Sequence, residues 1–170
     1  EDNNFDLIKN IMTGEIDPEN QFPWQSVIYS ESHDDFAFID RICSSGENSG
    51  MNPSFEEVKK AELAIIISLL SPGIPMLSAG QDFLRSKRGI RNTYLEPEIN
   101  ALDYQRLEKF KNFSCRIRSA ISFRLSKRGE FARPRSKNDC VYQTGVVAGK
   151  VFSLTITPRN NDEEFLFLCN

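Results

Sequence analysis

The sequence predicts an α/β fold in which two strand–helix units are followed by strands alone. Two observations predict it. Short β-branched and aromatic runs alternate with longer helical patterns as far as about Leu125, and each later apolar run has the length of a strand. This order is typical of a piece of parallel sheet or barrel joined to the start of an antiparallel module. Because two such units cannot close a barrel, we expect the sequence to be a piece of a longer protein.

The N-terminal part predicts a helix, a strand and a second helix. The first helix is expected to end near Gly14, and a Pro-bearing loop follows it. Residues 26–30, SVIYS, have the length and residue types of a strand. After a polar turn, helical spacing places Phe36, Ile39 and Cys43 on one face of the next helix.

The middle of the chain predicts two longer helices. The first covers residues 54–70, with Ser54 as its N-cap and Glu57 at the capping-box position. Its second half is apolar nearly all round, which predicts burial. A very short strand is expected over Ile74–Leu77, and a long helix from about Gln105 to Leu125. The apolar stripe of that helix is predicted to be core: Phe110, Phe113, Ile117 and Ile121. Three strand-like runs end the sequence: CVYQTGVVA, KVFSLTIT and EEFLFLCN.

Composition excludes several classes of protein. Hydrophobic residues at 39% and charged residues at 26% are typical of a globular protein with a core. A net charge of −3 argues against a general nucleic-acid binder. The longest apolar run, Leu63–Leu70, is far shorter than the roughly 18 residues that span a bilayer. Four widely spaced cysteines and one histidine predict neither a zinc site nor a disulfide framework, and no cofactor or metal is expected.

The polar residues that are the best candidates for a functional site lie together in one turn. The only histidine, His33, directly follows the predicted strand and is followed by Asp34 and Asp35. Taken alone, such a cluster is more often a solvated turn than a catalytic edge. What separates the two interpretations is the longer pattern around it.

That pattern resembles a known motif. Ser32, His33, Asp34, Asp40 and Arg41 fall without a gap on S-H-D-N, four residues, D-R/K. This is the seventh-strand motif of pullulanase-type debranching enzymes in the α-amylase superfamily, family 13 of the glycoside hydrolases.

A second block is similar to the eighth strand and following loop of the same family. Its pattern is G-I-P-x-x-x-A-G-x-E/D-F-L-R-S/T-K, then N-S-Y, then N-x-x-D-W. The matching residues are Gly73, Ile74, Pro75, Ala79, Gly80, Asp82, Phe83, Leu84, Arg85, Lys87, Asn92, Tyr94, Asn100 and Asp103. Two blocks in the right order, with a helix between them, make the resemblance specific.

The resemblance implies a fold and a division of the chain. Residues 1–127 would hold the last two βα units of a (β/α)8 TIM barrel, and residues 128–170 would begin a C-terminal antiparallel β-sandwich. In such barrels the active site lies at the C-terminal ends of the strands, where the polar turn is expected.

The resemblance also implies roles. Asp34 would be the catalytic residue that stabilises the transition state, and His33 would contact the same sugar. Further substrate-binding residues would be Asp35, Arg85, Lys87, Asn92 and Tyr94. The partner would be an α-glucan, with neither nucleic acid nor membrane involved. A carboxylate suits this task because its bonds to sugar hydroxyls strengthen as the ring flattens.

Three alternatives stay open beside α-1,6 cleavage: an α-1,4-acting relative, a non-catalytic glucan-binding module, and an unrelated domain that mimics the motifs. The family's nucleophile and acid/base come from earlier strands, so we expect this chain alone to be inactive. The family's Asn is Asp35 here. A second carboxylate beside Asp34 should raise the pKa of one of the two unless a cation compensates. Arg85 and Arg88 are the candidate cations.

Overall fold

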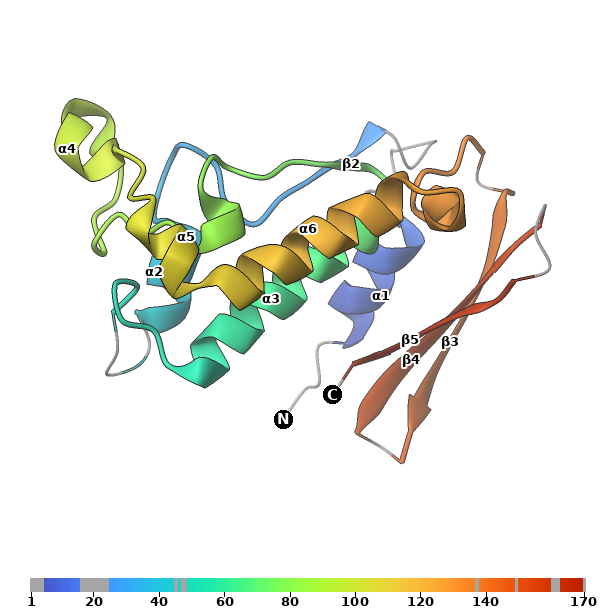
Figure 1. The fold of residues 1–170 in the computed structure, drawn as a ribbon. Coiled ribbons are helices and arrows are strands. Elements are labelled where there is room, and N and C mark those ends of the chain that lie inside the picture. The colour runs from blue at the N-terminus through green and yellow to red at the C-terminus, as the bar shows by residue number, and fades with distance from the viewer. Residues whose placement is uncertain are drawn as a thin grey trace. The chain divides into compact units, whose positions relative to one another are not determined.

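The computed structural model of the chain describes residues 5–15, 25–44, 46, 49–136, 138–148, 150–159 and 163–169. Up to residue 125 the described residues form mainly helices, with the short strands β1 and β2 among them, and after it they form one short 3-10 helix and three strands (Figure 1). In chain order the elements are α1 (Phe5–Thr13), β1 (Val27–Ile28), α2 (Phe38–Cys43), α3 (Phe55–Leu70), β2 (Ile74–Pro75), η2 (Gln81–Phe83), η3 (Thr93–Leu95), α4 (Pro97–Asn100), α5 (Gln105–Lys109), α6 (Lys111–Leu125), η4 (Arg128–Ala132), β3 (Cys140–Val147), β4 (Val151–Pro158) and β5 (Phe165–Cys169).

The chain forms two compact units that interleave along the sequence. One unit comprises Glu1–Ile28, Leu69–Ile74 and Phe123–Asn170, and the other comprises Tyr29–Ser68 and Pro75–Ser122. The predicted mixture of helices and strands is confirmed, as is the antiparallel sheet after the last long helix. The TIM barrel and the boundary between residues 127 and 128 stay predictions.

In the first unit, β3, β4 and β5 form an antiparallel sheet with β4 in the middle (Figure 1). Phe152, Leu154 and Ile156 of β4 are buried and alternate with more exposed residues. This period of two is that of a strand with one face on the core. On β5 the alternate residues Leu166 and Leu168 are more than half exposed.

The same unit contains the predicted N-terminal helix and its end. Gly14 has a φ of 77°, a left-handed conformation that glycine adopts without steric cost. Its N–H donates to the Ile11 carbonyl, and the Glu15 N–H donates to the Asn10 carbonyl. These are the two bonds of a Schellman motif, so α1 ends where the sequence predicted.

A buried arginine joins the end of α3 to the following turn. Arg124 of α6 donates to the carbonyls of Leu69 at 2.5 Å, Ser71 at 2.8 Å and Gly73 at 2.7 Å. The last carbonyls of a helix lack partners within the helix. Arg124 supplies these bonds, and the Ile74 N–H then bonds the Ser26 carbonyl where β2 meets β1.

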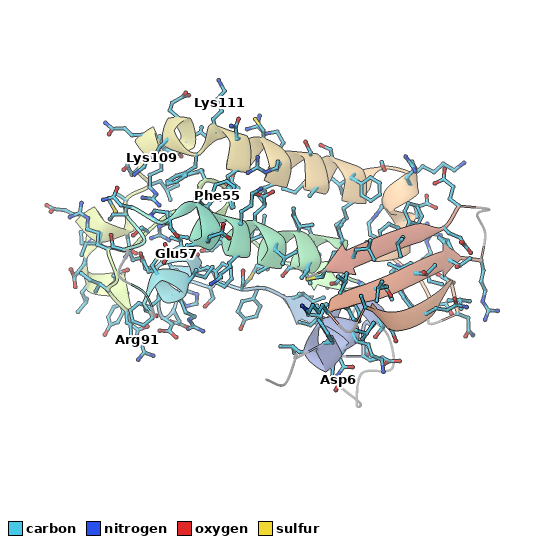
Figure 2. The ribbon with its side chains drawn as sticks, turned by 90° about the horizontal axis from the view of Figure 1, so that it is seen from below. Asp6, Phe55, Glu57, Arg91, Lys109 and Lys111 are labelled. Carbon is cyan, nitrogen blue, oxygen red and sulfur yellow. The ribbon has the colours of Figure 1, made fainter. Side chains whose placement is uncertain are left out.

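In the second unit, α3 begins with the predicted capping box. The Glu57 N–H donates to Ser54 Oγ at 3.3 Å, and the Ser54 N–H donates to Glu57 Oε2 at 2.7 Å. Glu57 and Phe55 both lie in the first turn of α3 (Figure 2). Glu57 is buried, whereas Phe55 is exposed with the Lys59 ammonium over its ring.

Helices α3 and α6 run side by side (Figure 1). In the second unit Arg116 Nε donates to Glu62 Oε1 at 2.5 Å, which ties the two helices together. The predicted core stripe is half right. Phe113 and Ile117 are buried, while Phe110 and Ile121 are only partly buried.

Three predicted elements differ in detail. The long helix is interrupted at Phe110, whose ψ of 32° leaves the helical range, so α5 and α6 are separate. The two strands of the β1–β2 sheet are each two residues long, shorter than the predicted runs 26–30 and 74–77. Phe36 precedes α2, so of the three predicted residues only Ile39 and Cys43 lie in the helix, and both are buried. Among the described residues, no helix has the length and apolarity to cross a bilayer.

Candidate active site

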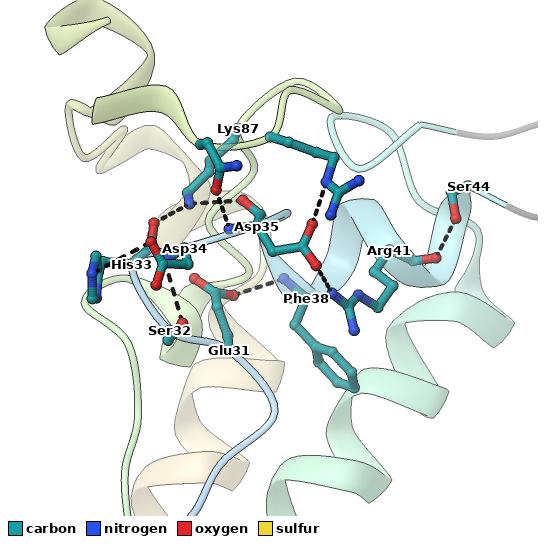
Figure 3. Close-up of polar contacts among 11 residues, drawn as sticks. Glu31, Ser32, His33, Asp34, Asp35, Phe38, Arg41, Ser44 and Lys87 are labelled. Atoms are coloured by element: carbon teal, nitrogen blue, oxygen red, sulfur yellow. Dashed lines mark hydrogen bonds and ion pairs between the residues drawn. The ribbon is translucent and has the colours of Figure 1, made fainter. Parts of the chain in front are cut away.

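The polar turn, residues 32–35, follows β1 and precedes α2 (Figure 3). Its path is fixed locally, because the Asp34 N–H donates to Ser32 Oγ at 3.3 Å. The two predicted sugar-contacting side chains point outward: His33 is 91% exposed and Asp34 is 75% exposed. His33 Nε2 lies 3.5 Å from Asp34 Oδ1. The turn therefore presents an imidazole and a carboxylate together to solvent.

The carboxylate of Asp35 is bonded to protein side chains and does not point freely into solvent. Its carboxylate accepts hydrogen bonds from Arg41 and, at 2.7 Å, from Arg91 Nε. Its φ of 60° lies in the left-handed region, where Asp and Asn are the tolerated residues apart from glycine. Desolvation opposes ionisation here, but the hydrogen bond and charge of Arg91, with the charge of Arg41, hold the pKa of Asp35 below its ordinary value. The compensating cations are thus Arg41 and Arg91, where the sequence suggested Arg85 or Arg88.

Lys87 and Arg85, both predicted to bind substrate, lie inside the protein. Lys87 is fully buried, and its Nζ donates to the carbonyls of His33 at 2.9 Å and Asp35 at 3.1 Å (Figure 3). Burial lowers the pKa of Lys87, and the charge of Arg85 lowers it further. Arg85 donates to Asn100 Oδ1 at 2.9 Å, and its Nε is buried without a hydrogen-bond partner in the described part of the chain. Both cations bind protein oxygens, and neither is aimed at solvent.

The other two predicted substrate-binding residues flank the turn differently. Asn92 supports it, because Asn92 Oδ1 accepts the Asp35 N–H at 2.8 Å. Tyr94 is 79% exposed on η3. The loop beneath is tied by Asn100, whose Oδ1 also accepts Thr93 Oγ1 at 2.6 Å. Of the seven predicted site residues, His33, Asp34, Asn92 and Tyr94 are exposed, and of these Asn92 uses its Oδ1 to hold the turn.

Four side chains near the turn were not predicted as site residues from the sequence: Glu31, Asp40, Arg41 and Arg91. Glu31 is buried, and its Oε2 accepts the Phe38 N–H at 2.8 Å, which closes the loop at the start of α2 (Figure 3). Its Oε1 has no hydrogen-bond partner among the residues that the structure describes. Burial is the main reason that the pKa of Glu31 is raised. Its position directly before the S-H-D triplet is the only sequence signal that could have marked it.

Asp40 and Arg41 were matched only as letters of the motif, and the structure gives both a role. Arg41 pairs with Asp35, as described above. Asp40 is buried and accepts two bonds of 2.6 Å, from Ser86 Oγ and from the Lys87 N–H. It therefore joins α2 to the loop after β2. A D-R pair next to a candidate site can hold that site in place, and Asp40 and Arg41 do so here.

Chemically, the turn can bind a polyhydroxylated ligand but offers no second free carboxylate. Both oxygens of Asp35 pair with arginines, and Glu31 is buried. Within the described part of the chain, no group of three His, Cys, Asp or Glu side chains could hold a metal ion. The four cysteines are free thiols.

Comparison with known proteins gives a consistent result. No family model matches the chain. Over 105 residues, 60% of its length, the chain is 39% identical to the pullulanase of Bacillus subtilis strain 168. The resemblance to pullulanases is confirmed. The chain spans only 14% of that relative.

Solved pullulanases share its fold. The Bacillus acidopullulyticus enzyme matches 100% of the chain with 21% of its own, at a TM-score of 0.84 and 22% identity, which shows the fold alone. The type I pullulanase of Bacillus subtilis, solved with maltose, matches 89% of the chain with 22% of its own length, at a TM-score of 0.76 and 28% sequence identity. The Paenibacillus barengoltzii pullulanase, solved with maltohexaose and α-cyclodextrin, matches 87% of the chain with 24% of its own length, at a TM-score of 0.71 and 28% sequence identity.

Proposed function

We propose that this chain is part of a pullulanase-type glycoside hydrolase that cleaves α-1,6 links in α-glucans such as pullulan, starch or glycogen. The identity to a curated pullulanase carries this proposal. The exposed His33–Asp34 pair supports it, because it gives the chain a group of the required chemistry at the end of β1. The maltooligosaccharides in the solved relatives make an α-glucan the ligand to test.

In this proposal the chain contributes the last two βα units of a (β/α)8 barrel, over residues 1–127, and the start of a β-sandwich over residues 128–170. Adjacent β1 and β2, with α3 between them in sequence, fit such units. The side-by-side arrangement of α3 and α6 fits them too, since neighbouring barrel helices lie together outside the strands (Figure 1).

Asp34 would act on the sugar at the bond to be cleaved. Its carboxylate would accept hydroxyl hydrogen bonds that strengthen as the ring flattens toward an oxocarbenium-like state, which lowers the barrier. His33, beside it, would donate a hydrogen bond to the same sugar. Tyr94, exposed on η3, would contact the glucan further out.

Retaining cleavage needs a nucleophile and an acid/base about 5–5.5 Å apart. The carboxylates next to Asp34 are engaged or buried, so these two groups would come from the preceding part of the barrel. The isolated chain would then bind glucan weakly and cleave none.

The test uses the longer protein that contains this chain, as wild type and as Asp34→Asn, with reducing ends measured after incubation with pullulan and with linear amylose. We expect cleavage of pullulan alone, reduced at least about 100-fold in the variant. The control is Asp6→Asn, the same chemical change on α1, which should leave the rate unchanged.

Each other outcome selects a rival. Cleavage of amylose favours an α-1,4-acting relative. Binding of maltotriose without any cleavage by the wild type favours a glucan-binding module. Full activity of Asp34→Asn would refute the role of the polar turn.

A further inference from the structure

The most unusual side chain near the polar turn is Lys87. A lysine is almost never fully buried unless it is paired, because its ammonium loses hydration. Lys87 is 0% exposed, and its Nζ bonds two backbone carbonyls, those of His33 and Asp35. These carbonyls lie on either side of Asp34. The ammonium thus grips the backbone immediately before and after the proposed catalytic carboxylate.

We propose that Lys87 is a positioning residue, which fixes the backbone of the polar turn and so aims the side chain of Asp34. The inference rests on the proposed function, and it replaces the direct sugar contact that the sequence suggested for Lys87. It deepens that function by assigning the orientation of Asp34 to a residue about fifty positions later in the chain.

The first support is that Lys87 is itself held at its base. Its N–H donates to Asp40 Oδ2 at 2.6 Å, and the neighbouring Ser86 Oγ donates to Asp40 Oδ1 at 2.6 Å. Asp40 is buried on α2. A lysine anchored at its backbone and bonded at its tip acts as a strut between α2 and the turn.

The second support is that Asp34 has little else to orient it. Among the described side chains, the carboxylate of Asp34 has one close polar neighbour, His33 Nε2 at 3.5 Å. The other ties of the loop, from Glu31 to the Phe38 N–H and from Asn92 to the Asp35 N–H, also act on the backbone or on flanking residues. The aim of the carboxylate therefore depends on where the backbone is fixed.

A displacement of the Asp34 carboxylate should lower the rate of the catalysed reaction strongly. Productive geometry has to be kept to within about 0.5 Å, and an error of about 1 Å costs on the order of 100-fold in rate. Without the ammonium, the carbonyls of His33 and Asp35 would have no common donor, and the turn could relax by that amount. Ground-state binding through other sugar units would be little affected.

The experiment compares Lys87→Met, Lys87→Arg and the exposed neighbour Arg88→Met in the longer protein. Methionine keeps the length and packing of the stem but removes the donors, and arginine restores donors at a changed geometry. For pullulan we expect Lys87→Met to lower kcat about 100-fold with KM changed less than about threefold. Lys87→Arg should recover part of kcat, and Arg88→Met should match the wild type.

A second readout needs no activity. The imidazole NMR signal of His33, the only histidine of these 170 residues, is identified in the longer protein as the signal that the His33→Gln variant lacks. In Lys87→Met we expect that signal to shift and broaden as the turn samples several conformations, while amides of α3 and α6 stay in place. Loss of all dispersion would mean global unfolding, in which case Lys87→Arg supplies the comparison.

The outcomes are distinct. A raised KM with unchanged kcat would make Lys87 a substrate contact and overturn the inference. Wild-type kinetics together with an unchanged His33 signal in folded Lys87→Met would overturn it as well. If the wild-type protein cleaves no glucan, the proposed function fails, and the His33 signal alone decides whether Lys87 holds the turn.

Discussion

Gly50→Ala tests the brace beneath the polar turn. A Cβ at residue 50 would lie 1.8 Å from Asp40 Oδ1 and 2.8 Å from Asp40 Cγ, far inside contact distance. The added methyl therefore has to displace the Asp40 carboxylate or the backbone around residue 50. Displacing the carboxylate breaks its bonds to Ser86 Oγ and the Lys87 N–H. Displacing the backbone loosens the Gly50 carbonyl from Arg106, which donates to it at 2.8 Å.

The magnitude follows from these two routes. Overpacking costs about 1–3 kcal/mol, and a hydrogen bond to a charged group contributes about 1.5–3 kcal/mol. Since the chain takes the cheaper route and relaxes in part, we expect a loss of about 3 kcal/mol in the free energy of unfolding. Urea denaturation followed by circular dichroism measures it, with the m-value checked for constancy.

Gly46→Ala is the matched control. Its Cβ would lie 3.2 Å from Glu57 Oε1, the end of a flexible side chain, so the loss should stay below about 1 kcal/mol. A Gly50→Ala protein within about 0.5 kcal/mol of wild type would refute the reasoning. It would mean that Asp40 does not hold α2 to the loop after β2.

Three further predictions concern ionised groups. Burial raises the pKa of Glu31, so the folded state binds the extra proton and loses stability as pH rises above the unfolded value near 4.5. Glu31→Gln should therefore be more stable than wild type by about 1 kcal/mol at pH 8 and equal to it near pH 4, as thermal melts across pH will show. The pKa of Asp35 is lowered, so its stabilisation is present above pH 3.8 and lost as pH falls through the folded value. Asp35→Asn should be less stable at pH 7, with a difference that shrinks in 1 M salt by the same melts, since salt screens its arginine pairs. Arg124→Met leaves three backbone carbonyls without their donor and should lower the free energy of unfolding, measured by urea denaturation, by about 3 kcal/mol. Arg118→Met, at an exposed position of the same helix, should lower it by less than about 0.5 kcal/mol.

What the sequence predicts well is local. Ser54 and Glu57 satisfy each other's backbone across three residues, and Gly14 ends α1 through bonds within one turn. Both depend on near neighbours only, so composition and spacing suffice. The C-terminal strands could also be predicted from the sequence, most clearly β4, along which apolar and polar residues alternate.

What the sequence predicts poorly is the contacts between side chains that lie far apart along the chain. Arg91, more than fifty residues after Asp35, takes the charge-compensating place that Arg85 was suggested to fill. Arg85 and Lys87 look like surface cations in a polar loop, yet both are buried, with Arg85 bonded to the side-chain amide of Asn100 and Lys87 to backbone carbonyls of the polar turn. No spacing rule reveals such partners. They become visible only when the loop after β2 is placed beside the turn after β1.

The way the polar turn is held has a consequence for variation. Every donor that Lys87 supplies to it goes to a carbonyl, and carbonyls are the same whatever residue carries them. His33 and Asp34 can thus be exchanged for other polar residues without removing a stabilising bond of the loop. A library randomised at these two positions should consequently be rich in folded members. The chain would offer a rigid two-residue platform on which new specificities can be selected at little risk to folding.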